Sequence, residues 1–302
     1  MRKNSLKRWI LKPVADKVFD LVVNFIVIIA VIVTIYPLYF VVLASISDPT
    51  AVQMGKVFLL PQGIHFSAYQ RIFTDSRIWV GYKNTVIYTL GGTAVGVFLT
   101  ILGGYALSRK DLVGRGIIMK LMVFTMYFNG GLVPTYMVVR DLNLTNTPYV
   151  LMLLGSFTVF NLIITRTFFM SKIPDELLEA ATVDGCGNGR FFTSIVLPLS
   201  KEIVAVIVLY YGVSHWNSFF NALIYISKQS LYPLQLILRE ILIGAQFLQM
   251  DGADAAARIE AQRLAETIKY GVIIIASLPA LVAYPFLQKF FIRGVMIGSI
   301  KG

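Results

Sequence analysis

Long apolar runs separated by short polar stretches dominate the chain, and they predict helices that cross a membrane. Six runs are long enough to do so, and they cover residues 18–46, 81–107, 116–139, 149–170, 201–225 and 268–288. Each run reaches the roughly 20 residues that an α-helix needs to span the hydrocarbon core of a bilayer. The pattern therefore predicts an all-α membrane protein with six transmembrane helices.

The third run is interrupted in its second half by Asn129-Gly130-Gly131 and by Pro134. Glycine and proline both weaken a helix, so we expect a bend or an unwound stretch there. Irregular backbone at membrane depth is tolerated only where protein covers it or where it lines a cavity. Tyr127 and Asn129 are therefore candidates for a translocation path.

Small residues form a stripe along the second run. Gly92, Gly96, Thr100 and Gly104 recur every four residues, so they lie on one face of a helix. Such stripes let membrane helices approach closely, and we favour this packing role over a role in a substrate path.

Polar side chains inside the fourth and fifth runs are the remaining candidates for a path. Polar groups in a span are costly and usually face the interior of a helical bundle. Asn217 and Asn221 are four residues apart, which places both on one face of a continuous helix. Hydrogen bonding between helices and a pathway role are equally good interpretations. The full candidate set for the path is Tyr127, Asn129, Asn161, Trp216, Asn217 and Asn221.

Composition supports the membrane class. The 302 residues are 57% hydrophobic, with a mean hydropathy of +0.72. The net charge of +11 would suit a nucleic-acid partner, but the basic residues stand at the ends of apolar runs rather than on one face. The basic segment 1–17 precedes an apolar run that is too long for a signal peptide. The positive-inside rule then places both termini in the cytoplasm, with outer loops at 48–80 and 226–267.

The sequence offers little for catalysis or metal binding. Its one cysteine, Cys186, cannot form a disulfide within the chain, and its two histidines are too few for a His-rich metal site. No G-x-x-x-x-G-K-[ST] phosphate loop occurs, and no acid/base pair stands out. We therefore assign no catalytic and no metal-binding residues, and we expect that the chain is not an enzyme.

A polar island at 174–198 separates the fourth and fifth runs, and its first half predicts a short helix. Pro174 suits the first helical position, and Asp175 and Glu176 then lie in the first turn, where the helix dipole favours negative charge. The pairs Leu177 with Ala181 and Leu178 with Thr182 give a narrow apolar face. Gly185 is placed to end the helix in a left-handed conformation.

The second half of the island predicts another short helix. Asn188 can cap its start, and Pro198 limits its end. One side of this helix carries Phe191, Phe192, Ile195 and Val196.

The spacing of the island resembles the "EAA" loop of ABC importer permeases. Glu179-Ala180-Ala181 is followed by Gly185, then by Ile195 and Leu197-Pro198, at the offsets of that motif. The resemblance implies that the loop 172–200 is a cytoplasmic coupling helix that docks into a cleft of an ATP-hydrolysing subunit. The residues to which it assigns this role are Pro174, Glu176, Leu178, Glu179, Ala180, Ala181, Asp184, Gly185, Ile195 and Pro198.

The C-terminal segment from Tyr284 to Gly302 resembles the tail of MalG-like permeases of sugar importers. The resemblance implies a type I ABC importer permease fold over residues 18–302, in a bacterial cytoplasmic (inner) membrane. It also implies a function, the import of a sugar or oligosaccharide. The implied partners are a second homologous permease, an ATPase dimer that binds ATP and Mg²⁺ in place of this chain, and an external solute-binding protein.

Two other functions compete with this one. A self-sufficient secondary transporter or channel usually places ionisable residues at the membrane midplane, and Asp and Glu are nearly absent from these runs. A membrane enzyme would require a catalytic group that the sequence does not show.

Overall fold

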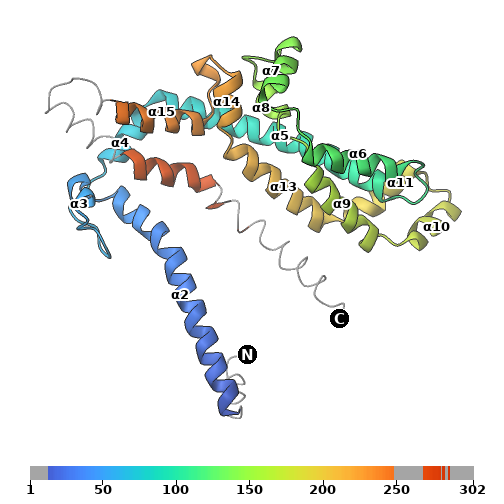
Figure 1. Ribbon diagram of the computed structural model, residues 1–302, viewed down its shortest axis with the longest axis horizontal. Coiled ribbons are helices and arrows are strands. Elements are labelled where there is room, and N and C mark those ends of the chain that lie inside the picture. Colours follow the sequence, from blue (N-terminus) through green and yellow to red (C-terminus); the bar gives the residue numbers. More distant parts are fainter. Residues whose placement is uncertain (1–12, 248–267, 280, 283–284, 286–302) are drawn as a thin grey trace. The chain divides into compact units, whose positions relative to one another are not determined.

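The computed structural model describes residues 13–247, 268–279, 281, 282 and 285, and Figure 1 shows its helices along the chain. Every regular element among these residues is helical, and no strand occurs in them, which confirms the all-α prediction. The chain divides into two compact units, residues 1–72 with 245–274 and residues 73–244 with 275–302. Each unit is described by itself.

The first unit is built on α2, Val14–Ser45, a helix of 32 residues. It runs through Pro37 without a break and contains the whole first apolar run except its last residue. The short helices α3 (Pro49–Gln53) and α4 (Ser67–Thr74) follow it. Gly271, in the helix Ile268–Pro279, packs against α4, where an added Cβ would lie 2.9 Å from Ile72 Cδ1.

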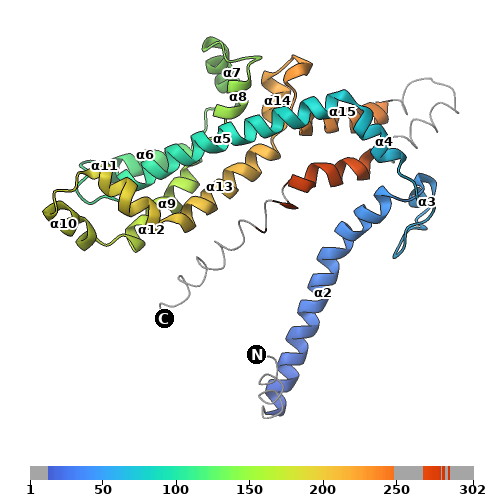
Figure 2. The same ribbon diagram turned by 180° about the vertical axis from the view of Figure 1, so that it is seen from behind.

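The second unit is organised around α5, Ser76–Ser108, a helix of 33 residues. Figures 1 and 2 show α9 (Val159–Lys172) and α13 (Lys201–Trp216) running along it. The predicted stripe of small residues forms these contacts. A Cβ at Gly92 would lie 2.5 Å from the His215 ring, and one at Gly104 would lie 2.6 Å from Thr165 Cγ2. The packing role predicted for the stripe is confirmed.

The third apolar run is broken where the sequence predicts it. It forms α6 (Arg115–Tyr127) and α7 (Leu132–Asp141), which are bent by 112° relative to each other. Between them Asn129 Oδ1 accepts a hydrogen bond from the backbone N–H of Gly131 at 2.8 Å. Gly131 has φ +87°, a conformation that suits glycine.

Two further breaks were not predicted, and the continuous helices expected over 149–170 and 201–225 are wrong. The fourth run is divided into α8 (Pro148–Leu153) and α9 by a turn in which Gly155 has φ +86°. In the fifth run, α13 ends at Trp216, and α14 (Phe220–Tyr225) begins after a break at residues 217–219.

Hydrogen bonds outside the regular helical pattern stabilise these breaks. The hydroxyl of Tyr211 in α13 accepts from the backbone N–H of Thr158 at 3.1 Å, just before α9. At the second break, the backbone N–H of Ser218 donates to the carbonyl of His215 at 3.2 Å. Contacts of this kind replace the helical bonds that each break removes.

Among the described residues, α2 and α5 alone are long and apolar enough to cross a membrane as single helices. The pair α6 and α7, and the pair of residues 188–199 with α13, bring the number to four if each bent pair is one span. The last predicted span is described as a helix over Ile268–Pro279.

The predicted outer loop 226–267 is only partly a loop. It contains a 3-10 turn at Gln229–Leu231 and α15, Leu234–Phe247. Leu234 is fully buried, and its backbone N–H donates to Thr85 Oγ1 of α5 at 2.8 Å. The start of α15 is therefore packed core. The charged stretch 248–267 lies outside the described residues.

Candidate coupling site

The first half of the polar island forms the expected helix, α10, Asp175–Val183. Pro174 stands one position earlier than predicted, at the N-cap, with an extended ψ of 150°. Asp175 and Glu176 lie in the first turn, as predicted. Gly185 ends the helix with φ +71°, so its predicted left-handed conformation is confirmed.

The second half is a helix of mixed type. It comprises α11 (Asn188–Phe191), a π-helical stretch at Phe192–Val196 and α12 (Leu197–Leu199). Gly187 occupies the N-cap and Asn188 the first helical position, so the predicted cap by Asn188 is wrong. The helix ends one residue after Pro198, and the chain turns by 80° into α13. Proline lacks the N–H that would continue regular helical bonding, which accounts for the π-helical stretch before it.

A buried apolar cluster anchors both halves of the loop to the spanning helices. Its buried members are Ile101, Phe169, Ala181, Phe191, Val196, Ile203, Ile207 and Tyr211. Leu178 and Ile195 pack against it and are half-buried. Leu178, Ala181 and Ile195 therefore face the chain's own core, whereas the sequence analysis assigned them to the partner surface. Truncating a buried aromatic such as Phe191 costs about 3–5 kcal/mol, so the cluster holds the loop firmly.

The opposite face of α10 is open. Pro174, Glu176, Glu179, Ala180, Asp184 and Gly185 are exposed there. Two apolar side chains join them, Leu177 with 38% and Val183 with 87% of its surface exposed. Glu176, Ala180 and Val183 follow the i, i+4, i+7 spacing of one helical face. We call the set Glu176, Ala180 and Val183 the outer face of α10, with Leu177 at its edge.

Sequence reasoning missed Val183. It precedes the charged Asp184 at the end of a short helix, and its apolar side chain gave no local sign of exposure. The same helical spacing from Glu176 could have identified it.

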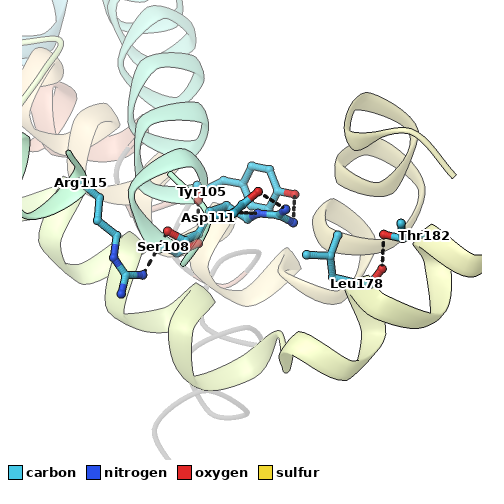
Figure 3. A network of polar contacts seen from close by, with 7 residues as sticks. Tyr105, Ser108, Asp111, Arg115, Leu178 and Thr182 are labelled. Carbon is cyan, nitrogen blue, oxygen red and sulfur yellow. Dashed lines mark hydrogen bonds and ion pairs between the residues drawn. The ribbon is translucent and has the colours of Figure 1, made fainter. Parts of the chain in front are cut away.

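The turn after α5 supports the start of α10, and Figure 3 shows its polar contacts. The Arg109 guanidinium donates to Asp111 at 2.8 Å and holds the pKa of that carboxyl below its usual value. Lys110 forms an ion pair with Asp175 of α10, which raises the pKa of Lys110. Both side chains of this pair are exposed, so the pair guides orientation more than it stabilises.

A cavity of about 220 Å³ lies between this turn and α10. Arg166 of α9 also donates from Nε to the carbonyl of Leu107, at 3.0 Å, near the end of α5. The loop 172–200 is thus held to the turn after α5 by an ion pair and to α5 itself by the apolar cluster, while Arg166 bonds the neighbouring helix α9 to α5.

The structure does not bring all the candidate path residues together. Trp216 and Asn217 line an apolar groove of about 770 Å³ along α5 and α13, whose other polar lining groups are Thr89 and Thr93. The Asn217 amide donates to the carbonyl of Val213 at 2.9 Å, at the end of α13. Asn221 lies in α14, so the two asparagines do not share one helical face, because the helix breaks between them.

The other candidates lie elsewhere. Tyr127 ends α6 with 73% of its surface exposed, next to the turn formed by Asn129. Asn161 is buried near the start of α9. Among the residues that the structure describes, no three His, Cys, Asp or Glu side chains come together as a metal site would require.

The apolar helices, and the exposed helix α10 on the loop between two of them, agree with the membrane permease that the sequence predicts. No protein-family model matches the chain. It is 37% identical over 287 residues to the polygalacturonan/rhamnogalacturonan transport system permease protein YtcP of Bacillus subtilis (strain 168). The aligned residues make up 95% of this chain and 99% of that protein. It is also 37% identical over 270 residues to protein LplC of the same organism, 89% of this chain and 90% of the relative.

Among solved structures, the fold matches the crystal structure of a bacterial ABC transporter involved in the import of the acidic polysaccharide alginate. The TM-score is 0.81 at 31% identity, over 93% of this chain and 99% of the matched chain. The chain therefore belongs to the permease subunits of carbohydrate ABC importers. The resemblance and the importer permease fold expected from the sequence are confirmed.

Proposed function

We propose that this permease carries an acidic oligosaccharide across the bacterial cytoplasmic membrane, driven by an ATPase that docks on the outer face of α10. Two proteins similar to the chain support the substrate class. One is named for polygalacturonan and rhamnogalacturonan transport, and the other belongs to a transporter involved in alginate import. Polygalacturonan and alginate are both chains of sugar acids.

The single observation that carries the docking proposal is the two-sided character of α10. Leu178 and Ala181 fix the helix to the core, while Ala180 and Val183 lie exposed on its other side. A short helix with small and apolar exposed residues fits a groove on a partner protein. The exposed Glu179 can pair with a basic or amide group at the rim of that groove.

In this proposal the partner ATPase dimer binds ATP and Mg²⁺. The sequence of this chain has no phosphate-binding loop of its own. The chain acts as a transport subunit rather than an enzyme. Its role is to transmit the movement of the docked ATPase to α5, α9 and α13.

A second permease subunit fits the apolar groove along α5 and α13. The groove is lined almost entirely by apolar side chains, which suits a protein helix better than a sugar. The hydroxyls of Thr89 and Thr93 have no hydrogen-bond partner within the described residues, and both line the groove. A partner helix can supply those bonds.

The remaining assignments follow from orientation. With both termini in the cytoplasm, the loop 172–200 faces the ATPase, and segments 48–80 and 226–267 face an external solute-binding protein. We keep Tyr127, Asn129, Asn161, Trp216, Asn217 and Asn221 as the proposed pathway set, in which Trp216 and Asn217 both line the groove.

Uptake into proteoliposomes tests the substrate class. The chain, its partner permease and its ATPase would be reconstituted with the solute-binding protein from the same gene cluster. We expect ATP-dependent uptake of oligogalacturonides and little uptake of neutral malto-oligosaccharides of the same length. Uptake of the neutral series alone would contradict the acidic substrate. Co-purification of the ATPase with Glu179→Lys, compared with wild type, tests docking separately, and unchanged recovery would contradict that part.

A further inference from the structure

Residues 54–66 follow α3 and carry an unusual number of exposed apolar side chains. Phe58, Leu59, Leu60, Ile64 and Phe66 are each between 60% and 71% exposed, within a stretch of nine residues. Exposed apolar clusters of this density mark contact with a protein or a membrane.

The segment is fixed alongside α2. The hydroxyl of Tyr39 donates to the carbonyl of Leu59 at 2.6 Å, and the hydroxyl of Tyr36 donates to the carbonyl of Phe58 at 3.4 Å. The rings of Tyr36 and Phe58 also contact each other, with centroids 5.5 Å apart. Figure 1 shows this loop after α3, beside the end of α2.

The far end of the loop is closed by backbone hydrogen bonds. The N–H of Asp48 donates to the carbonyl of Gln62 at 2.8 Å, and the N–H of His65 donates to the carbonyl of Ile46 at 2.9 Å. The loop therefore folds back along the helix with part of its backbone already paired, which lowers the cost of placing it in an apolar environment.

The position of the two tyrosines sets the depth of the loop. Tyr39 and Tyr36 lie six and nine residues before Ser45, the last residue of α2, which is about 9 Å and about 14 Å along the axis. The last charged residue of α2 is Asp20. A helix needs about 20 residues to cross the hydrocarbon core, so the crossing that begins after Asp20 ends near Phe40. Tyr36, Tyr39 and Phe40 thus occupy the level of an aromatic belt, where the hydrocarbon ends.

We propose that Phe58, Leu59 and Leu60 insert into the bilayer at this level, in the leaflet opposite the basic N-terminal segment. The occupant of the surface is lipid, at the boundary between acyl chains and headgroups, and the rest of segment 48–80 stays on the water side, where the proposed solute-binding protein docks. The loop then anchors one end of α2, and it is continuous with a helix that is exposed over most of its length up to the buried residues Leu43, Ala44 and Ser45. This inference concerns the membrane contact of the chain and does not depend on its substrate or on ATPase docking.

Spin labels test the depth directly. Single cysteines would replace Phe58 or Leu60 in a Cys186→Ser background, in the full-length chain reconstituted with its partner subunits in phospholipid bilayers. Lys56→Cys, two residues before Phe58 and exposed, is the aqueous control, and Ile29→Cys in the middle of α2 is the hydrocarbon control. Collision rates with O₂ and with a water-soluble nickel chelate would be compared at each label.

We expect the ratio of O₂ to nickel collisions at positions 58 and 60 to be several-fold above that at position 56 and below that at position 29. Removing the Tyr39 hydroxyl with Tyr39→Phe should lower the ratio at position 60, because the loop loses its attachment to α2. Nickel access equal to that at position 56 would overturn the proposal in favour of a soluble partner. Protection from both reagents would overturn it in favour of contact with another subunit.

Discussion

The side-chain hydroxyl of Tyr211 lies 2.7 Å from the hydroxyl of Thr100 and 3.1 Å from the backbone nitrogen of Thr158. One buried residue of α13 is thus bonded both to α5 and to the turn that precedes α9. It joins α5 to α9 and α13, the two helices that the loop 172–200 connects, and it satisfies a backbone donor that the break in the fourth apolar run leaves without a helical partner.

We expect Tyr211→Phe to keep the packing of the ring and to leave the Thr158 N–H unpaired. The fully buried hydroxyl of Thr100 also loses its partner, and a buried polar group left unpaired costs about 1–3 kcal/mol, so the free energy of unfolding should fall by about that amount. Thermal unfolding in detergent would show a lower midpoint. Tyr210→Phe is the matched control, since Tyr210 is 42% exposed; an equal loss in both variants would contradict the role of the Tyr211 hydroxyl.

The packing of α5 against α13 predicts a second effect. In Gly96→Ala the new Cβ would lie 2.6 Å from the carbonyl oxygen of Ser156 and 2.9 Å from the Tyr211 ring. Overpacking of this kind costs about 1–3 kcal/mol, and the variant should unfold at a lower temperature.

The control for this substitution is Gly116→Ala in α6, where no atom lies within 4 Å of the added Cβ. Alanine favours a helix over glycine by up to about 1 kcal/mol, so this variant should be as stable as wild type or more so. If Gly96→Ala were equally well tolerated, the close approach of α5 to its neighbours would not be needed for stability.

The exposure of Val183 predicts a change in binding without a change in folding. Val183→Asp removes an apolar contact from the outer face of α10 but alters no buried group, since 87% of the residue is exposed. We expect thermal stability like that of wild type and a clear loss of ATPase on co-purification. Full ATPase recovery with this variant would remove Val183 from the docking surface.

Apolar run length and turn chemistry predict the parts of the fold that depend on local sequence. The run 18–46 becomes α2, the run 81–107 becomes α5, and Asn129-Gly130-Gly131 marks the bend between α6 and α7. The break at Gly155 was missed because Gly155-Ser156 stands inside a largely apolar run and because a bond that stabilises it comes from Tyr211 of α13, about 55 residues away along the chain.

The candidate site, too, has features that local sequence predicts and features that depend on long-range contacts. Gly185 could be predicted because a helix end requires a residue that tolerates positive φ. The inward direction of Leu178 and Ala181 could not, because it depends on Phe169, Phe191 and Val196, which only the folded chain brings to that side of α10.

In the proposed function α10 links ATP hydrolysis to the spanning helices, and Gly185 tests this role most directly. Gly185 has φ +71° with open space around its Cα, and Gly187 has φ −70° with equally open space. Valine is therefore strained by about 1–3 kcal/mol at position 185 and accommodated at position 187. The measurement is ATP hydrolysis by the reconstituted importer, with and without loaded solute-binding protein. We predict that Gly185→Val loses the stimulation and that Gly187→Val keeps it; wild-type stimulation in Gly185→Val would contradict the account.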